Sequence, residues 1–421
     1  MHQKAILDNG LRIVTSAMAH ARSICTSIYI GAGSRYELPQ QAGISHFIEH
    51  LCFKGTERRP TTKEICEDIE GVGGIFNGGT CKEFTTYWAK VARPHFPIAL
   101  DVLADMLLHS KFDPMEIEKE RKVITEEIKR SMDSPQDLVD ILIDEVLWPD
   151  QALGRDVAGS KETIRTISRQ MISDYMPRQY LPNNTVVSVA GDVSHDEVVA
   201  SFAKVFADWP QGVCGTWFPV VNNQHAPRLR VESKKTEQAH LCLAVPGLSS
   251  MNPDRYISDI INVILGEGMS SRLFLEIRER RGLAYDIHSY SSHLLDSGSV
   301  TIYAGVDPKK VKDTIVAILK ELSQLKEEKV PESELVKAKE LAKGRLMLSM
   351  EDTRSVSGWM GAQELLTGNI RSVDEVVSIV DAINPEDVQR VAQGLFLTNG
   401  LTLALVGPIR NPNRLESLLN I

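Results

Sequence analysis

The pattern of apolar and polar positions along the chain predicts strands mixed with helices. Strands are expected at Ile24–Ile30 and Thr185–Ala190, with a hairpin turn at Asn9-Gly10. Helical periodicity runs from about Pro94 to His109 and from Pro114 to Arg130. Because runs of strands are mixed with runs of helices, without strict β-α alternation, the pattern favours α+β domains with a mainly antiparallel sheet.

The two halves of the chain share a pattern that recurs at one constant offset. The series Ile167, Ser168, Asn183 and Gly191 recurs as Ile383, Asn384, Asn399 and Gly407. Ser168 and Asn384 precede helical patterns, and we expect both to act as N-caps. The stretch from Pro210 to Arg228 is typical of a linker. The repeat therefore predicts two similar domains, residues 1–210 and 228–421, each with a mainly antiparallel sheet flanked by helices.

The segment His46-Phe-Ile-Glu-His50 carries the first candidate chemistry. Residues four apart lie on one face of a helix, so His46 and His50 can point at a common atom, with Glu49 beside it. Two neutral imidazoles suit Zn²⁺, and a carboxylate that is not a ligand can take the proton from a zinc-bound water. The alternative is a helix whose histidines simply pack or face solvent.

A catalytic zinc site takes three protein ligands, so a carboxylate is expected from another element. The segment from Asp113 to Lys129 reads as one helix, in which Glu120 and Glu127 are almost two turns apart and share a face. Glu126 is turned away from that face. A solvated, highly charged helix is the alternative interpretation.

Together these motifs make the chain resemble the pitrilysin/insulinase family of zinc peptidases. After the His-x-x-Glu-His motif comes a Glu-Arg-x-Val-x-x-x-Glu run that ends at Glu127. That family includes the mitochondrial processing peptidases. The resemblance also covers Leu51–Thr56, Asn77–Thr80, Ala152–Arg155 and Tyr180–Asn184. It implies that Glu127 is the third zinc ligand and that Glu120 orients the ligands. The second half lacks the motif and has Ala338 and Arg345 where Glu120 and Glu127 would align, so one zinc per chain is expected.

The resemblance also indicates residues that bind the substrate. Family enzymes use an Arg and a Tyr seven residues apart in the C-terminal half to reach the scissile peptide, and Arg278 and Tyr285 have this spacing. A surface Arg and a packed Tyr are the alternative. Asn77 lies on a segment that resembles the family's edge strand, where a peptide would add as a further strand. Gly78 replaces the usual Ala there, which makes that strand more flexible.

Three acidic residues, Asp137, Asp140 and Asp144, share one face of a predicted helix. Related processing peptidases use acidic residues in this neighbourhood to bind a basic residue upstream of the cut, which makes Asp137 and Asp140 candidate substrate-binding residues. A solvated acidic face is the alternative.

Composition narrows the class of protein further. The net charge of −9 argues against a basic face for nucleic acid. The six cysteines show no Cys-x-x-Cys spacing and are typical of reduced thiols, so a cytoplasmic location is expected. The start of the chain leads directly into a hairpin signal without a signal peptide, and no apolar run reaches membrane-spanning length.

The sequence thus favours a zinc endopeptidase that hydrolyses unstructured peptides or presequence-like segments. The alternative is a non-catalytic scaffold or a partner subunit of a processing-peptidase-like complex. General peptide degradation and specific processing both remain open. Family enzymes enclose substrate between four domains, and this chain has two, so we expect a homodimer.

Overall fold

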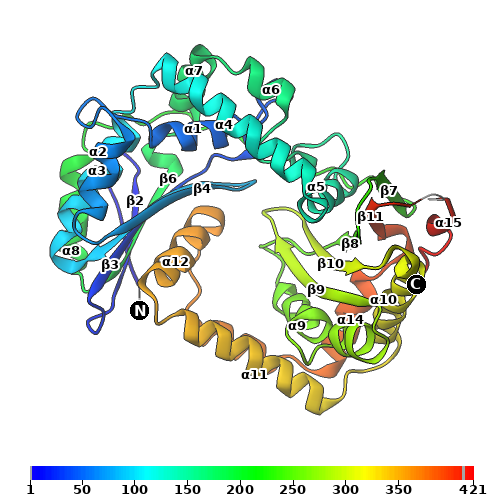
Figure 1. The fold of residues 1–421 in the computed structure, drawn as a ribbon. Helices are drawn as coiled ribbons and strands as arrows, with labels where there is room; N and C mark the ends of the chain where they lie inside the picture. Colours follow the sequence, from blue (N-terminus) through cyan, green and yellow to red (C-terminus); the bar gives the residue numbers. More distant parts are fainter. Residues whose placement is uncertain (1, 410–412) are drawn as a thin grey trace. The chain divides into compact units, whose positions relative to one another are not determined.

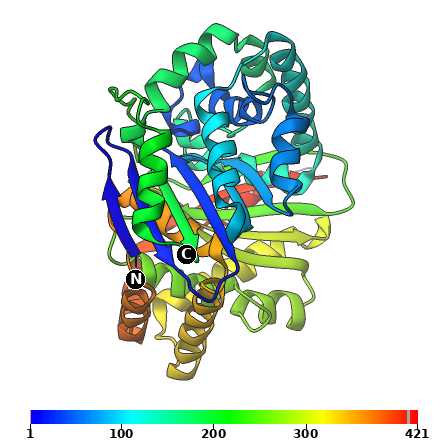
Figure 2. The same cartoon turned by 90° about the vertical axis from the view of Figure 1, so that its left-hand side faces the viewer.

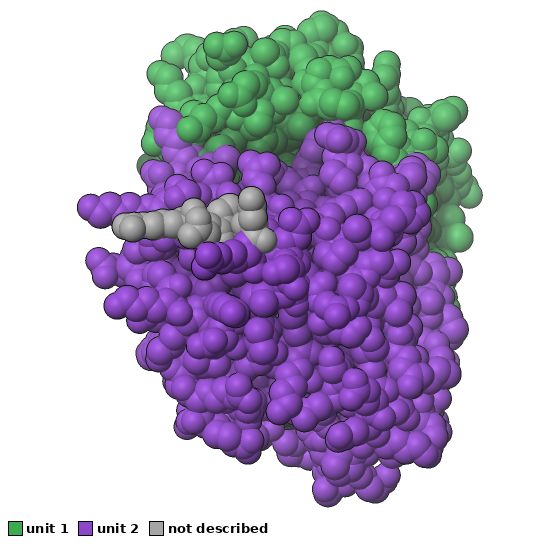
Figure 3. All heavy atoms as spheres, turned by 90° about the vertical axis from the view of Figure 1, so that its right-hand side faces the viewer, with its two compact units in different colours: residues 1–128, 156–218, 347–372 green, residues 129–155, 219–346, 373–421 purple. Residues whose placement is uncertain are grey.

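The chain, seen in a computed structural model that describes residues 2–409 and 413–421, forms two compact units. Unit 1 consists of residues 1–128, 156–218 and 347–372, and unit 2 of residues 129–155, 219–346 and 373–421, coloured separately in Figure 3. Each unit contains one sheet of mostly antiparallel strands with helices packed on it. This confirms the predicted α+β class.

The sheet of unit 1 has six strands in the order β1-β2-β6-β3-β5-β4. They are β1 His2–Ile6, β2 Arg12–Ala17, β3 Ser23–Ile30, β4 Ile75–Thr80, β5 Thr85–Ala92 and β6 Thr185–Gly191. Strands β2 and β6 are parallel, and the other neighbours are antiparallel. Figure 2 shows the blue N-terminal strands beside the green strand β6. Strand β4 lies at one edge of this sheet.

In the part of the chain that the structure describes, the sheet of unit 2 repeats this plan without an equivalent of β1. Its order is β7-β11-β8-β10-β9, with β7 and β11 parallel and the other neighbours antiparallel. The strands are β7 Arg228–Ser233, β8 Ala239–Pro246, β9 Ala284–His293, β10 Gly298–Val306 and β11 Thr402–Gly407. The parallel pair occupies the same place in both sheets, so the sequence repeat corresponds to a repeat of topology.

The helices include the two predicted at about Pro94–His109 and Pro114–Arg130. They are α1 Ile44–Cys52, α2 Thr62–Glu70, α3 Phe96–Leu108, α4 Pro114–Asp133, α5 Pro135–Leu147, α6 Lys161–Thr166, α7 Arg169–Gln179, α8 His195–Val205, α9 Arg255–Gly266, α10 Val311–Glu327, α11 Glu332–Ser349, α12 Thr353–Thr367, α13 Val373–Ala382, α14 Pro385–Leu395 and α15 Asn413–Glu416, with a π-helix at Phe274–Arg280. Ser168 and Asn384 both cap helices with their side chains, as predicted.

Helix α7 contains a proline in its last turn. It runs to Gln179 with Pro177 inside it. The amide of Tyr180 donates to the carbonyl of Met176 over 2.8 Å, so the last turn closes after the proline.

The central strands β3 and β6 of the first sheet are buried on both faces, and alternate residues point to opposite sides. Ile28 and Val187 belong to the main core, which α1 and α3 share. Their neighbours Tyr29 and Val186 belong to a second core, formed with Val356 and Met360 on α12. The helix that carries the candidate metal ligands therefore rests on a sheet that is supported from both sides.

The two compact units do not coincide with a single cut between residues 210 and 228. Helix α5, from the first half of the sequence, packs on β7, β8 and β11 of unit 2, and α12, from the second half, packs on β2, β3 and β6 of unit 1 (Figure 1). Apolar residues of α5, such as Leu142, form a core with Cys242 and Val406. Each sheet thus buries one face against a helix from the other half of the chain.

Candidate metal centre

Helix α1 is held at its start by a buried carboxylate and a glycine. Gly43 precedes the helix at φ 94°, in the left-handed region. A Cβ there would lie 2.6 Å from the carbonyl oxygen of Ala158. Glu37 accepts hydrogen bonds from the amides of Gly43 (2.8 Å) and Ser45 (2.9 Å), two donors with no partner inside the helix. The apolar face of α1, which includes Phe47 and Ile48, is fully buried in the core.

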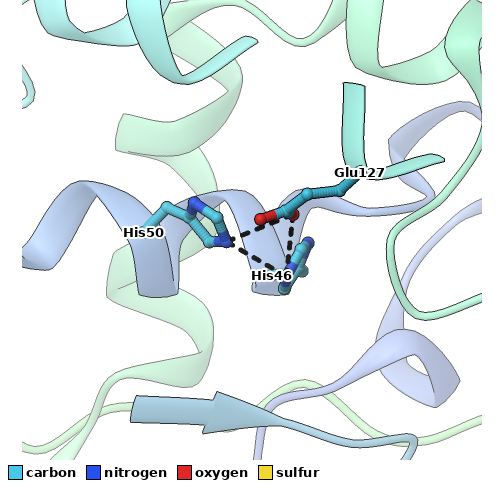
Figure 4. A group of neighbouring side chains, drawn as sticks. All are labelled: His46, His50 and Glu127. Atoms are coloured by element: carbon cyan, nitrogen blue, oxygen red, sulfur yellow. Dashed lines mark hydrogen bonds and ion pairs between the residues drawn. The ribbon is translucent and has the colours of Figure 1, made fainter. Parts of the chain in front are cut away.

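His46 and His50 project from the opposite side of α1 toward Glu127 of α4 (Figure 4). The two Nε2 atoms are 3.2 Å apart, and Glu127 Oε2 lies 4.0 Å from His46 Nε2 and 3.7 Å from His50 Nε2. Among the described residues, this is the group of three whose donor atoms all lie within 4.8 Å of one another. The structure therefore brings together the three residues that the sequence proposes as ligands.

These distances fit a zinc ion. Tetrahedral zinc with bonds of about 2.0–2.1 Å keeps its ligand atoms about 3.3 Å apart. The His46–His50 separation of 3.2 Å already meets this value, and the two distances to Glu127 exceed it by well under 1 Å. Two imidazole nitrogens and one carboxylate oxygen also form a His₂Glu donor set, which is one of the sets used by catalytic zinc.

Glu120 fixes the ring of His50. Its Oε2 lies 3.0 Å from His50 Nδ1, and its Oε1 lies 2.9 Å from Lys54 Nζ. Although burial opposes it, the contacts with His50 and Lys54 lower the pKa of Glu120, so its carboxylate is ionised and can only accept. His50 therefore donates from Nδ1, which leaves Nε2 as the nitrogen that can bind a metal.

The two histidines differ in their electrostatics. Burial, reinforced by the neighbouring His50, lowers the pKa of His46 to about 4, so its ring is neutral at pH 7. Burial also acts to lower the pKa of His50, but the hydrogen bond to Glu120 and the negative charge of Glu127 together raise it. A metal at Nε2 would have to displace the proton that His50 gains in this way.

Glu49 is placed beside the ligands by strand β4. Its Oε2 accepts a 2.8 Å hydrogen bond from the hydroxyl of Thr80, and its Oε1 would lie 2.8 Å from a Cβ on Gly78. Burial raises the pKa of Glu49, partly offset by the bond from Thr80. Because its pKa is raised, this carboxylate binds a proton more readily than a solvated one does, which suits a general base.

Sequence reasoning did not assign roles to Lys54 and Thr80. Both lie inside motifs that carry the family resemblance, and Lys54 follows His50 by four residues. That spacing is the signal that could have placed Lys54 next to the partner of His50. No comparable signal exists for Thr80, because its contact with Glu49 depends on how β4 crosses α1.

The remaining predicted site residues occupy other places. Asn77 is exposed on edge strand β4, where its side chain accepts from the amide of Gly78 over 2.8 Å. In unit 2, the structure brings Arg278 and Tyr285 together: the guanidinium lies 5.2 Å from the centre of the Tyr285 ring. Tyr285 is 75% exposed at the start of β9, so it is not a packed core residue.

The acidic residues of α5 have different surroundings. Asp137 is exposed, whereas Asp140 is half-buried and accepts hydrogen bonds from Cys242 (3.2 Å) and Tyr290 (3.1 Å). Burial raises the pKa of Asp140. Its Oδ1 is thus already engaged inside unit 2, and a role for it in substrate binding stays a prediction.

Comparison with known proteins identifies the class to which this fold and site belong. Residues 12–161 match the family model described as Insulinase (Peptidase family M16), and residues 166–341 match the one described as Peptidase M16 inactive domain. The chain therefore belongs to the M16 family of peptidases, the pitrilysin/insulinase family, which confirms the resemblance.

Particular relatives span almost the whole chain. An uncharacterized zinc protease of Bacillus subtilis, YmxG, is 39% identical over 98% of this chain and 99% of its own length. The crystal structure of a protease from Helicobacter pylori has a TM-score of 0.91 at 23% identity and covers 97% of this chain and 99% of that one. A Pseudomonas fluorescens structure described as a peptidase M16 inactive domain has a TM-score of 0.90 at 18% identity and covers 97% and 98%. The two structures establish the fold alone.

Two further features concern the environment of the protein: the character of its helices and the state of its cysteines. Across residues 2–409 and 413–421, no helix combines the length and the apolar character required to cross a bilayer. All six cysteines are free thiols, and Cys25, Cys52 and Cys242 are buried. The cytoplasmic location stays a prediction.

Proposed function

We propose that this protein is a zinc endopeptidase that hydrolyses unstructured peptides. The observation that carries the proposal is the convergence of His46, His50 and Glu127 on one point, within distances that suit zinc. The names of the relatives, which are zinc proteases, support the same metal and the same class of reaction. One zinc per chain is expected, because the second half lacks the motif.

A zinc ion bound by these three residues would polarise a water and the substrate carbonyl. Glu49 acts as the general base: its Oε2 accepts the Thr80 hydroxyl, so Oε1 is the oxygen that takes the proton from the attacking water. Glu49 then passes this proton to the leaving amine. Glu120 holds the Nδ1 proton of His50 throughout and does not touch the substrate.

The peptide binds along β4. This strand lies at the sheet edge directly beside Glu49, and a peptide added there gains backbone hydrogen bonds without strict sequence demands. Asn77 is exposed on this edge and offers its side chain to the peptide backbone. Arg278 and Tyr285, which stack on each other, contact the scissile carbonyl and stabilise its developing negative charge. Asp137 and Asp140 are the candidates for binding a basic residue of a presequence-like substrate.

The second candidate is a non-catalytic subunit of a processing-peptidase-like complex. A similar fold belongs to a protein described as an inactive domain, so the fold alone does not choose between the two. The presence of Glu49 together with all three ligand residues favours the enzyme.

The test combines metal analysis with digestion of a fluorogenic peptide library. The purified chain should carry about one zinc and cleave peptides, and a chelator should abolish cleavage until zinc is restored. His50→Ala is the matched control and should lose both metal and cleavage. A chain that binds no zinc and leaves the whole library intact would instead be the non-catalytic subunit.

We also propose that the enzyme is a homodimer. A chain with two units supplies half of the four-domain enclosure expected for the family, and a second copy is the simplest source of the other half. Light scattering at assay concentration should give twice the chain mass of 46.8 kDa. A fully active monomer would contradict this proposal.

A further inference from the structure

Lys54 belongs to a chain of contacts that leads to the metal centre. It follows the end of α1, four residues after His50. Its Nζ lies 2.9 Å from Glu120 Oε1, while Glu120 Oε2 lies 3.0 Å from His50 Nδ1. One carboxylate thus bridges an ammonium group and a histidine that both come from the same short stretch.

The carboxylate in the middle is buried. Glu120 is 4% exposed, so water cannot readily replace a lost partner. Each of its oxygens has one partner, and this division fixes how the carboxylate plane is turned. If Lys54 were removed, Oε1 would be buried without its cation, and the carboxylate could regain solvation only by rotating or moving away from His50.

If Lys54 orients Glu120, its removal should weaken zinc binding, whereas charge repulsion alone predicts that its removal should strengthen zinc binding. The ammonium group is a positive charge close to a site for a divalent cation, so removing it should strengthen metal binding by reducing repulsion. Positioning and repulsion therefore differ in the sign of their effect on zinc affinity. That difference makes the role of Lys54 measurable.

We propose that Lys54 is a positioning residue of the metal centre. It holds the Glu120 carboxylate in the orientation that keeps the His50 ring turned with Nε2 toward Glu127 and His46. The inference rests on the proposed zinc function. It adds a role for a residue that touches neither metal nor substrate.

The experiment measures zinc affinity of the full-length, metal-free protein by competition with a chromophoric chelator. Loss of a direct partner of a metal ligand typically costs about 10–100-fold in affinity, and Lys54 is one contact further out. Lys54→Met should therefore raise the zinc dissociation constant by about 3–10-fold. Lys54→Arg restores a cation and should stay within about 2-fold of the parent protein.

Two controls separate this effect from general ones. Lys63→Met removes a lysine of the same unit that forms an exposed pair with Glu67, and it should leave zinc affinity unchanged. In a Glu120→Gln background, Lys54→Met should weaken binding no further, because the residue through which it acts is already altered. Lys54→Gln, with the same expectation, replaces Lys54→Met if the methionine variant does not fold.

The outcomes are distinct. Unchanged or tighter zinc binding in Lys54→Met would overturn the inference, and so would an equal loss in the Glu120→Gln background. Both of these leave the proposed zinc function intact, because the parent protein still binds the metal. Failure of the parent protein to bind zinc would overturn the proposed function and this inference together.

Discussion

At the scale of single residues, the site depends on hydrogen bonds that orient the reacting side chains. Glu49 is the proposed base, and a hydrogen bond from the hydroxyl of Thr80 fixes which way its carboxylate faces. The same relation holds between Glu120 and His50. A side chain that transfers a proton at one particular atom is effective only if its orientation is fixed.

Removal of the Thr80 hydroxyl should therefore slow the reaction. Thr80→Val keeps the shape of the side chain but loses the bond to Glu49, and we expect kcat to fall by about 10-fold with KM nearly unchanged. Thr80→Ser keeps the hydroxyl and should remain close to the parent protein. Steady-state kinetics on one cleaved peptide, with zinc content measured in parallel, checks this. An equal loss in both variants would contradict the role of the hydroxyl.

The sequence could predict the candidate ligand residues and the orienting role of Glu120, but not the contact of Thr80 with Glu49. His46, Glu49 and His50 are close along one helix, so helical geometry alone brings them together. Glu127 required the family resemblance, because a second helix must be packed against the first. Thr80 approaches Glu49 only through the packing of β4 against α1, which no local pattern encodes.

At the scale of elements, the start of α1 sets the position of both histidines. Gly43→Ala adds the cost of a left-handed backbone, roughly 1–2 kcal/mol, and a contact of 2.6 Å with the Ala158 carbonyl. Gly73 is the matched control, because it has a similar φ of 73° but no atom within 4 Å of its added Cβ. Thermal melting should show a larger loss for Gly43→Ala, and only that variant should bind zinc more weakly. Equal losses would show that the contact has no effect.

Helix α12 depends on a cap that responds to pH. Asp352 accepts from the amides of Arg354 (2.9 Å) and Ser355 (3.1 Å) and pairs with Lys90 of β5. The Lys90 contact, followed by these amide bonds, lowers the pKa of Asp352. A lowered folded-state pKa means that the cap stabilises the fold above the ordinary aspartate range, and that this contribution is lost as pH falls through the folded-state value.

We therefore expect Asp352→Ala to lower the Tm at pH 7 and to matter less in acid. A lost N-cap costs about 1 kcal/mol, which corresponds to a Tm decrease of roughly 2–4 °C in a domain of this size. The carboxylate is 46% exposed, so the ion pair itself adds little. Melting curves of both proteins at stepwise lower pH check the sign. A difference that grows on acidification would refute the assignment.

The packing of α5 and α12 on the sheet formed mainly by the other half of the chain lies beyond what the sequence could predict. The apolar stripes of α5 and α12 show that each helix covers a sheet, but not which sheet it covers. The repeat and the linker predicted two similar units, because turn signals and strand runs are local. The packing partner of a helix is set by the whole chain.

At the scale of the whole molecule, the repeat has produced two units with different chemistry. In unit 2, buried Ala338 takes the place of Glu120, and Arg345, which pairs with Glu267, takes the place of Glu127. Unit 2 therefore offers no equivalent ligand set at the aligned positions. Its candidate contribution to the reaction is the pair formed by half-buried Arg278 and exposed Tyr285.

In a homodimer, we expect this pair to act on the zinc site of the other chain. The test mixes two inactive proteins, Glu49→Gln and the double variant Arg278→Ala/Tyr285→Ala, under conditions that allow subunit exchange. Mixed dimers would then contain one site with all three residues intact, and activity should return. If the pair acts within its own chain, every site stays defective, and no mixture recovers.

The most direct test of the central claim is to measure bound zinc and peptide turnover in Glu49→Gln beside the parent protein. The substitution keeps His46, His50 and Glu127 and removes only the base. We predict about one zinc per chain in both proteins and loss of nearly all turnover in the variant. Hydrolysis by Glu49→Gln at the rate of the parent protein would contradict the mechanism.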